Sequence, residues 1–173
     1  MNLFLTLAFL FLIGSVLGWG LEVIFRRFFS AHRWVNPGFL VGPYLPLYGS
    51  SLCVLYLLAM LESLMPVENP LLKKIMLFVV MALAITALEY VAGLIFIRGM
   101  KIKLWDYSDR WGNIQGIICP LFTFFWMVLS AVYYFLIHPH ILNALHWLAE
   151  NLAFSFGIGF FYGVFLIDVG YST

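Results

Sequence analysis

Glu89 is the residue most able to do chemistry, because it is a carboxylate inside a long apolar stretch. The stretch covers residues 75–97 and reads as a membrane-spanning helix. At 1.5 Å per residue, Glu89 lies about 12 Å from the end of that helix. A carboxylate near the helix centre costs about 2.5–3.5 kcal/mol, so such a residue is a functional candidate whose partner must be named. The candidate partners are Arg98, Tyr107 and Asn113.

Two further carboxylates belong to the same hypothesis. Glu22 lies four residues before Arg26 near the end of the first apolar stretch, and Asp106 follows the stretch that holds Glu89. A Glu–Arg pair at this spacing is worth about 0.2–0.5 kcal/mol on a helix surface, so Glu22 is either a surface ion pair or a site residue. We predict that Glu22, Glu89 and Asp106 form an acidic, aromatic-rimmed pocket open to the cytoplasm.

The aromatic rim comes from the segment 104–116, in which rings alternate with polar groups. Trp105, Tyr107 and Trp111 are interleaved with Asp106, Asn113 and Gln115. Trp and Tyr favour the interface of any membrane protein, so an interfacial belt explains the rings equally well. It explains the polar groups between them less well. The predicted substrate-binding residues are therefore Glu22, Glu89, Trp105, Asp106, Tyr107 and Asn113.

A second unusual segment precedes the second apolar stretch. From Val35 to Gly49 it has no charged residue, three prolines and three glycines. Proline interrupts a helix, and non-helical backbone at membrane depth must be buried in protein or line a wet cavity. We expect a re-entrant or cap-like loop. Its structural residues, together with one glycine of the other loop, are Pro37, Gly38, Gly42, Pro43, Tyr48, Gly49 and Gly116.

The composition indicates which scaffold must position these residues. The chain has 173 residues, of which 64% are hydrophobic and 10% charged, whereas a soluble domain carries about 25% charged residues. This excludes a soluble enzyme, a disordered tail and a nucleic-acid binder. We predict an all-α polytopic membrane protein, a single domain over 1–173. Its five transmembrane helices cover about 3–25, 47–64, 75–97, 117–137 and 142–167, and Pro139 separates the last two.

The basic residues predict the orientation of these helices. Seven of them follow the first and third stretches, namely Arg26, Arg27, Arg33, Arg98, Lys101, Lys103 and Arg110, whereas the opposite side holds Lys73 and Lys74. Positively charged loops remain in the cytoplasm. We therefore expect the N-terminus outside, and both unusual loops and the C-terminus inside.

Other patterns carry weaker predictions. No zinc-binding motif is formed by His138, His140, His146 and Glu150. We expect Cys53 and Cys119 to pack as small apolar residues. The sequence therefore predicts neither a metal nor a cofactor. Glycine pairs at Gly14/Gly18 and Gly159/Gly163 suit close helix contacts, either within the bundle or in a homo-oligomer.

The two halves of the chain resemble each other weakly. Leu21-Glu22, Trp34-x-Asn36 and Gly42-Pro43 precede one helix, and Leu88-Glu89, Trp111-x-Asn113 and Cys119-Pro120 precede another. This order suggests a repeat of two plus two helices with a fifth appended, and transporters often bind solutes between repeats. The unequal spacings leave chance as an alternative.

Three separated motifs resemble one bacterial family. Asn36–Gly49, Leu88–Tyr90 and Leu104–Gly116 occur in the order typical of the "Putative ABC-transporter type IV" (CmpB-like) family. The resemblance covers about Gly14 to Val132 and leaves the last helix outside. It implies a permease-like protein of the prokaryotic cytoplasmic membrane. The chain lacks a GxxxxGK[ST] loop, so any ATPase would be a separate subunit.

Three functions fit these patterns. The first is a small permease or transport component that binds a small polar or cationic solute. The second is a membrane-embedded enzyme for a lipid or prenyl-linked substrate, with Glu89 or Asp106 as general acid or base. The third is a non-catalytic scaffold subunit. Membrane lipid is the expected surrounding partner in each case.

Overall fold

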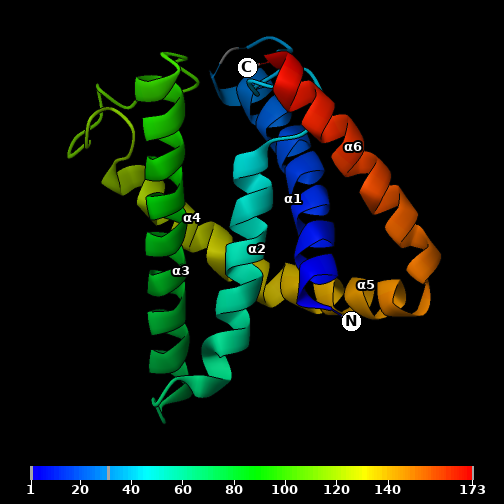
Figure 1. Cartoon of the computed structure of the whole chain (residues 1–173). Coiled ribbons are helices and arrows are strands. Elements are labelled where there is room, and N and C mark those ends of the chain that lie inside the picture. Colours follow the sequence, from blue (N-terminus) through cyan, green and yellow to red (C-terminus); the bar gives the residue numbers. More distant parts are fainter. Residues whose placement is uncertain (1, 31, 173) are drawn as a thin grey trace. The chain divides into compact units, whose positions relative to one another are not determined.

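Figure 1 shows the computed structural model, which describes residues 2–30 and 32–172. Within these residues the chain is helical, and the strand-like pairing is a single bridge between Ile114 and Ile118. Five helices are long and apolar enough to cross a membrane: Leu3–Phe29, Pro46–Leu64, Pro70–Gly99, Pro120–Glu150 and Leu152–Ser172. The predicted all-helical membrane fold with five spanning helices is confirmed.

Shorter regular elements make up these spans. The α-helices are α1 (Leu3–Phe25), α2 (Pro46–Met60), α3 (Pro70–Gly93), α4 (Pro120–Val132), α5 (His138–Glu150) and α6 (Ser155–Ser172). Single π-helical turns follow α1, α3 and α4, at Arg26–Ser30, Leu94–Gly99 and Tyr133–Ile137. Short 3₁₀ turns cover Leu61–Leu64 and Leu152–Phe154. Proline is the first residue of α2, α3 and α4, where its missing N–H costs no hydrogen bond.

The boundary between the last two spans differs from the prediction. We expected helices over 117–137 and 142–167 separated at Pro139, but the helix continues from Pro120 to Glu150 and the next begins at Leu152. A π-helical turn precedes Pro139, and the His138 N–H donates to the carbonyl of Tyr133. Pro139 is then the second residue of α5. A proline in the first turn of a helix removes no hydrogen bond, so it does not end the span.

The chain folds into two compact units. The first contains the residues up to Cys53 and those from Leu142 onward, and the second is Val54–Ile141. The single domain expected from the sequence stays a prediction.

Glycines bring α1 and the beginning of α2 together in the first unit. A Cβ atom at Gly18 would lie 2.2 Å from the Cβ atom of Tyr48, and one at Gly49 would lie 2.2 Å from Ser15 Oγ. Gly14 lies against Leu52 in the same way. The Gly14/Gly18 face therefore packs within the chain, which decides between the two alternatives for this pair.

The last helix packs on the first within the same unit. α1 and α6 run in the same direction and come together at the end where the first loop lies (Figure 1). The Tyr162 hydroxyl donates to the carbonyl of Ala8 at 3.1 Å, and its ring stacks on Phe11 with a centroid distance of 5.9 Å. The helix that the sequence analysis appended to the repeat thus packs on α1 in this unit.

In the second unit, α3 and α4 form the core. Met81 and Ile85 of α3 are fully buried. Gly93 allows the backbone of α3 to approach Ile117, because a Cβ atom there would lie 2.1 Å from Ile117 Cγ2. The segment before α4 is therefore fixed to the end of α3.

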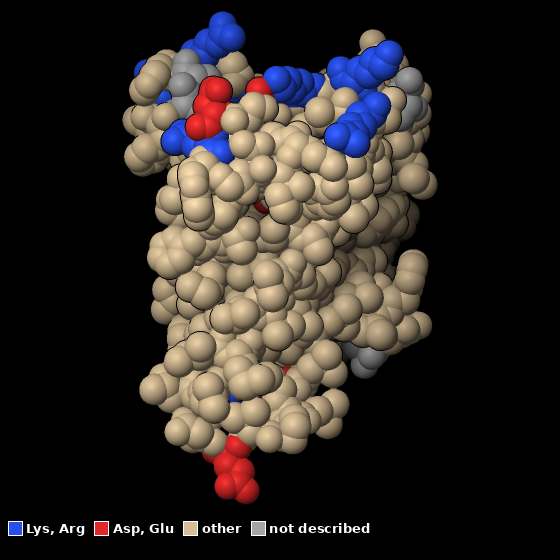
Figure 2. All heavy atoms as spheres, turned by 90° about the vertical axis from the view of Figure 1, so that its left-hand side faces the viewer, with Lys and Arg blue, Asp and Glu red and all other residues tan. Residues whose placement is uncertain are grey.

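The outward faces of the helices are apolar. Leu83 and Phe124 in the second unit, like Phe160 in the first, are exposed. Figure 2 shows a broad band of uncharged side chains below an end where lysines and arginines gather. Large continuous apolar surfaces of this kind require a partner, which for spanning helices is the lipid.

The contact of Gly49 with α1 leads to a stability prediction. Gly49→Ala forces its methyl group against Ser15 and the carbonyl of Phe11, and overpacking of this kind costs about 1–3 kcal/mol. Thermal unfolding in detergent measures the loss. Gly20→Ala is the matched control, because no atom lies within 4 Å of a Cβ atom there, and we expect it to be neutral or slightly stabilising. Equal Tm values for the two variants would contradict the assignment.

Candidate functional site

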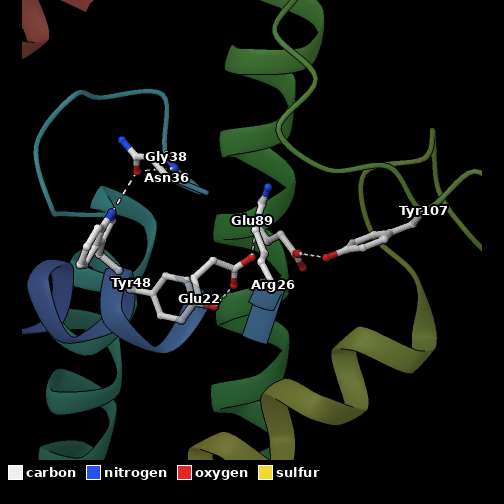
Figure 3. A network of polar contacts seen from close by, with 8 residues as sticks. Glu22, Arg26, Asn36, Gly38, Tyr48, Glu89 and Tyr107 are labelled. Carbon is white, nitrogen blue, oxygen red and sulfur yellow. Dashed lines mark hydrogen bonds and ion pairs between the residues drawn. The ribbon is translucent and has the colours of Figure 1, made fainter. Parts of the chain in front are cut away.

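Glu89, in the last turns of α3 in the second unit, is a deeply buried carboxylate. Its exposed fraction is 3%. The Tyr107 hydroxyl donates to one carboxylate oxygen at 3.0 Å, and the Trp126 indole N–H donates to the other at 3.0 Å. Figure 3 shows the Tyr107 phenol pointing at this carboxylate from the loop. Glu89 thus joins α3, the second loop and α4, and Tyr107 is confirmed as one of its partners.

Aromatic rings surround this carboxylate in the same unit. The Tyr107 ring stacks on Phe122 with a centroid distance of 4.2 Å and an interplanar angle of 13°. One turn of α3 before Glu89, the Thr86 hydroxyl donates to that of Thr123 on α4 at 3.1 Å. The result is a buried acidic group beside a phenol, an indole and a phenyl ring.

The other predicted residues of the second loop make their hydrogen bonds within it. The Trp105 indole donates to the carbonyl of Ile117, and Asp106 accepts from both the N–H and the hydroxyl of Ser108. Asn113 donates to the carbonyls of Ser108 and Arg110 and accepts from the Gly116 N–H. These groups give the loop a defined shape, and through it they place Tyr107.

Gly116, predicted to be a structural residue of the loop, lies at a tight turn. Its φ of +70° lies in the left-handed region, which glycine adopts without strain. A Cβ atom there would also lie 2.5 Å from Ser108 Oγ, and the Gly116 carbonyl accepts from the Tyr107 N–H at 2.8 Å. A larger residue would displace the backbone that carries Tyr107.

Glu22 is the corresponding carboxylate of the first unit. The Arg26 guanidinium donates to it at 3.0 Å, and the Tyr48 hydroxyl donates at 2.9 Å (Figure 3). The Glu22–Arg26 ion pair expected from the spacing of four residues is therefore present. Tyr48, expected to be a loop residue, lies in the first turn of α2 and connects this helix to α1.

The first loop is non-helical, as predicted, and is held by Asn36. The Asn36 carbonyl oxygen accepts from the Trp19 indole at 2.9 Å and from the Gly38 N–H at 3.2 Å, and its amide donates to the carbonyl of Leu40. Pro37, Leu40 and Tyr44 are buried. Burial of the loop in protein meets the condition for non-helical backbone at membrane depth. The Gly42 backbone touches the ring of Tyr44, and Pro43 between them is exposed.

Asp168 is a buried carboxylate whose contacts sequence reasoning missed. It was expected to be a solvated carboxylate at a helix end, but its exposed fraction is 9%. It accepts hydrogen bonds from the N–H groups of Val41 and Gly42, from the Tyr44 hydroxyl and from the Ser172 hydroxyl. All four donors are neutral. Asp168 therefore attaches the first loop to α6.

Trp126 was also missed, although its sequence carried a signal. A buried indole N–H usually has a hydrogen-bond partner. Trp126 lies in the apolar stretch 117–137, which follows the one that holds Glu89. Asp168 had no comparable signal, because its partners are backbone N–H groups and a tyrosine more than 120 positions away in the chain.

Two groups outside the spans have shifted pKa values. Burial and the hydrogen bond to Asp168 raise the pKa of Tyr44 to about 12, so the phenol keeps its proton at neutral pH. The Lys103 ammonium, helped by Ser108, holds the pKa of the Asp106 carboxyl well below its usual range. Asp106 is thus a charged, largely exposed group of the loop.

The histidines of α5 make local contacts. His138 shares a hydrogen bond with the Tyr133 hydroxyl at 2.9 Å, and His146 lies 3.5 Å from Glu150. In the part of the chain that the structure describes, no three His, Cys, Asp or Glu side chains gather closely enough to hold a metal ion.

The attachment of the loop by Asp168 leads to a second prediction. Tyr44→Phe removes one donor and should lower the Tm by a few degrees, whereas Asp168→Asn disturbs four hydrogen bonds and should lower it further. Ser172→Ala, which removes a donor from α6 itself, should have the smallest effect. Thermal unfolding and proteolysis of the first loop measure these changes.

The sign of the pH dependence follows from the raised pKa of Tyr44. Its ordinary value is about 10, so its stabilising contribution is complete below pH 10 and is lost as the pH rises through about 12. Tyr44→Phe should weaken the loss of stability over this range. An unchanged Tm in both Tyr44→Phe and Asp168→Asn would show that the loop does not need this attachment.

Comparison with known proteins places the chain in a family. The sequence matches the family described as "Putative ABC-transporter type IV" over residues 9–173. The match includes α6, so the expectation that the resemblance ends near Val132 was wrong. No curated protein and no solved structure matches the chain. Because the match spans nearly the whole sequence, the chain belongs to the "Putative ABC-transporter type IV" family.

Proposed function

We propose that this ABC-transporter-related membrane component binds a small polar or cationic solute through the buried carboxylate of Glu89. The observation that carries the proposal is the environment of Glu89, with 3% exposure and a phenol and an indole as donors. Ionisable side chains inside spanning segments are costly, and they mark solute and ion pathways.

The aromatic rings indicate the kind of solute. A cation is attracted by a carboxylate and also by the faces of Trp, Tyr and Phe rings, and quaternary ammonium groups are bound in such surroundings. Tyr107 and Trp126 direct their O–H and N–H groups at Glu89, and Phe122 covers one face of the Tyr107 ring, so in this proposal the cation contacts the carboxylate and the remaining ring faces. A small organic cation therefore fits better than an anion.

In this proposal the remaining predicted residues have two roles. Glu22 offers a second carboxylate with a tyrosine donor, and it takes part in binding. Trp105, Asp106 and Asn113 shape the loop that presents Tyr107. That Glu22 and Glu89 act on one solute molecule stays a prediction, and a double variant Glu22→Gln/Glu89→Gln tests it, because residues that bind one solute give non-additive losses.

The partners and the orientation are part of the proposal. An ABC-transporter family implies a separate ATPase subunit, since the chain has no phosphate-binding loop. The excess of basic residues after the first and third spans supports a cytoplasmic membrane location in a prokaryote, with the N-terminus outside and the C-terminus inside. Gly159 and Gly163, which have no atom within 4 Å of a Cβ position, remain the proposed face for a homo-oligomer.

A second candidate function is a non-catalytic scaffold subunit. The observation that favours it is the use of Trp105, Asp106 and Asn113 for hydrogen bonds within their own loop. In a scaffold the buried glutamates would serve only to join helices and loops, and no solute would bind.

Ligand-dependent thermal stabilisation distinguishes the two functions. With choline as the cationic probe at 100 times its Kd, wild type should gain about 2.7 kcal/mol, a rise of roughly 5–10 °C in Tm. Glu89→Gln, compared with its own unliganded Tm, should show little rise. Asp109→Asn removes an exposed carboxylate from the same loop and should respond like wild type.

Putrescine and glycerol extend the same measurement to a dication and a neutral polar solute. If none of the three probes stabilises wild type, the scaffold is favoured. If choline stabilises Glu89→Gln as strongly as wild type, Glu89 is not the binding carboxylate.

A further inference from the structure

We propose that an apolar groove on the second unit binds one acyl chain of an anionic phospholipid, with its headgroup at the basic second loop. The groove lies between α3 and α4 and has a volume of about 420 Å³, within the range of about 300–1,000 Å³ that is usual for small-molecule sites. The proposal does not depend on the solute site, because Glu89 does not line the groove.

The groove has an apolar wall and opens to the outside. Val79 and Leu83 line it from α3, Phe124 lines it from α4 and Ile114 lines it from the loop. All four side chains are exposed by more than two fifths. On the face of two spanning helices the material that fills such a groove is hydrocarbon, because contact of this apolar surface with water is unfavourable.

The second loop closes the groove at one end. Gly112, which lines the groove, has a φ of +65° and lies close to Pro120, the first residue of α4. Asn113 donates to the carbonyl of Arg110 at 2.9 Å and so holds the turn that precedes Gly112. The backbone of Arg110 is therefore fixed two residues from the groove.

The charge of the loop selects the headgroup. Between Arg98 and Arg110 the chain has four basic residues, with Lys101 and Lys103 between them, against Asp106 and Asp109. Lys103 is paired with Asp106, and Figure 2 shows basic side chains gathered at this end of the visible face. A basic cluster next to a spanning helix attracts anionic headgroups.

Trp111 supports the position of this cluster at the interface. Its side chain is 87% exposed although it lies between Arg110 and the groove-lining Gly112. An exposed indole is stable at the headgroup level of a bilayer, where its ring and its N–H are both satisfied. The headgroup of a lipid whose chain lies in the groove would be at the same level.

A second apolar groove on the same helices supplies an internal control. It is lined by Ile75 and Phe78 of α3 and by Val128 of α4, among others, and has a volume of about 560 Å³. No residue of the second loop lines it. It should therefore be filled by bulk lipid without selection for charge.

The test uses native mass spectrometry of the purified protein with dioleoyl phosphatidylglycerol and dioleoyl phosphatidylcholine. Val79→Trp fills the first groove, and Val128→Trp fills the second from a position of nearly equal exposure, 42% against 44%. We expect wild type and Val128→Trp to retain bound phosphatidylglycerol. Val79→Trp should retain at least tenfold less of it than wild type. Leu83→Trp repeats the test from the rim if Val79→Trp does not fold.

The charge is tested separately. One basic residue near a membrane surface contributes about fivefold to anionic lipid binding, so Arg110→Gln should reduce phosphatidylglycerol binding by about this factor and leave phosphatidylcholine unchanged. Lys73→Gln, at the opposite end of α3, is the control. The proposal is overturned if wild type retains both lipids equally, or if the two tryptophan variants lose phosphatidylglycerol to the same extent.

Discussion

The need to satisfy polar groups away from water dominates this structure. Two non-helical loops, at 32–45 and 100–119, adjoin spanning helices whose surfaces are apolar, and their backbone N–H and carbonyl groups need partners. Asparagine side chains provide them in both loops: Asn36 bridges Gly38 and Leu40, and Asn113 bridges Arg110 and Gly116. The carboxylates Glu89 and Asp168 then attach each loop to a helix through tyrosine hydroxyls.

Because this need recurs, the two units use the same devices. In each, a spanning helix ends in a π-helical turn, a glutamate four or five residues before that turn accepts from a tyrosine, and a proline begins the helix after the loop. A π-helical turn often accompanies a functional site in a helix. These parallels agree with the internal repeat suggested by Glu22 and Glu89, which stays a prediction. The loop lengths differ, and so do the anchoring contacts: Tyr107 of the second loop donates to Glu89, whereas the first loop is attached to Asp168 through Tyr44.

Composition and apolar length were sufficient to predict the five spans, because the bilayer limits helix length directly. They were insufficient at Pro139, where a π-helical turn lets the helix continue. Glu89 was found because a carboxylate is conspicuous in an apolar stretch, and Tyr107 because it is near in sequence. Asp168 was missed since its meaning depends on Val41, Gly42 and Tyr44, which only the fold brings to it. Contacts between distant, individually ordinary residues leave no pattern in the sequence.

The role of Asp168 also bears on how the first loop could act. A loop anchored only to neighbouring residues could move as a flap, but four hydrogen bonds to one carboxylate on α6 connect its position to that helix. The pKa of Tyr44 is raised to about 12, so this connection persists across the physiological pH range. Any movement of the loop must therefore either break the Asp168 contacts together or carry α6 with it. The second route retains the Asp168 contacts but strains the Tyr162–Ala8 hydrogen bond and the Phe11–Tyr162 stacking that hold α6 on α1, so both routes oppose movement of the loop.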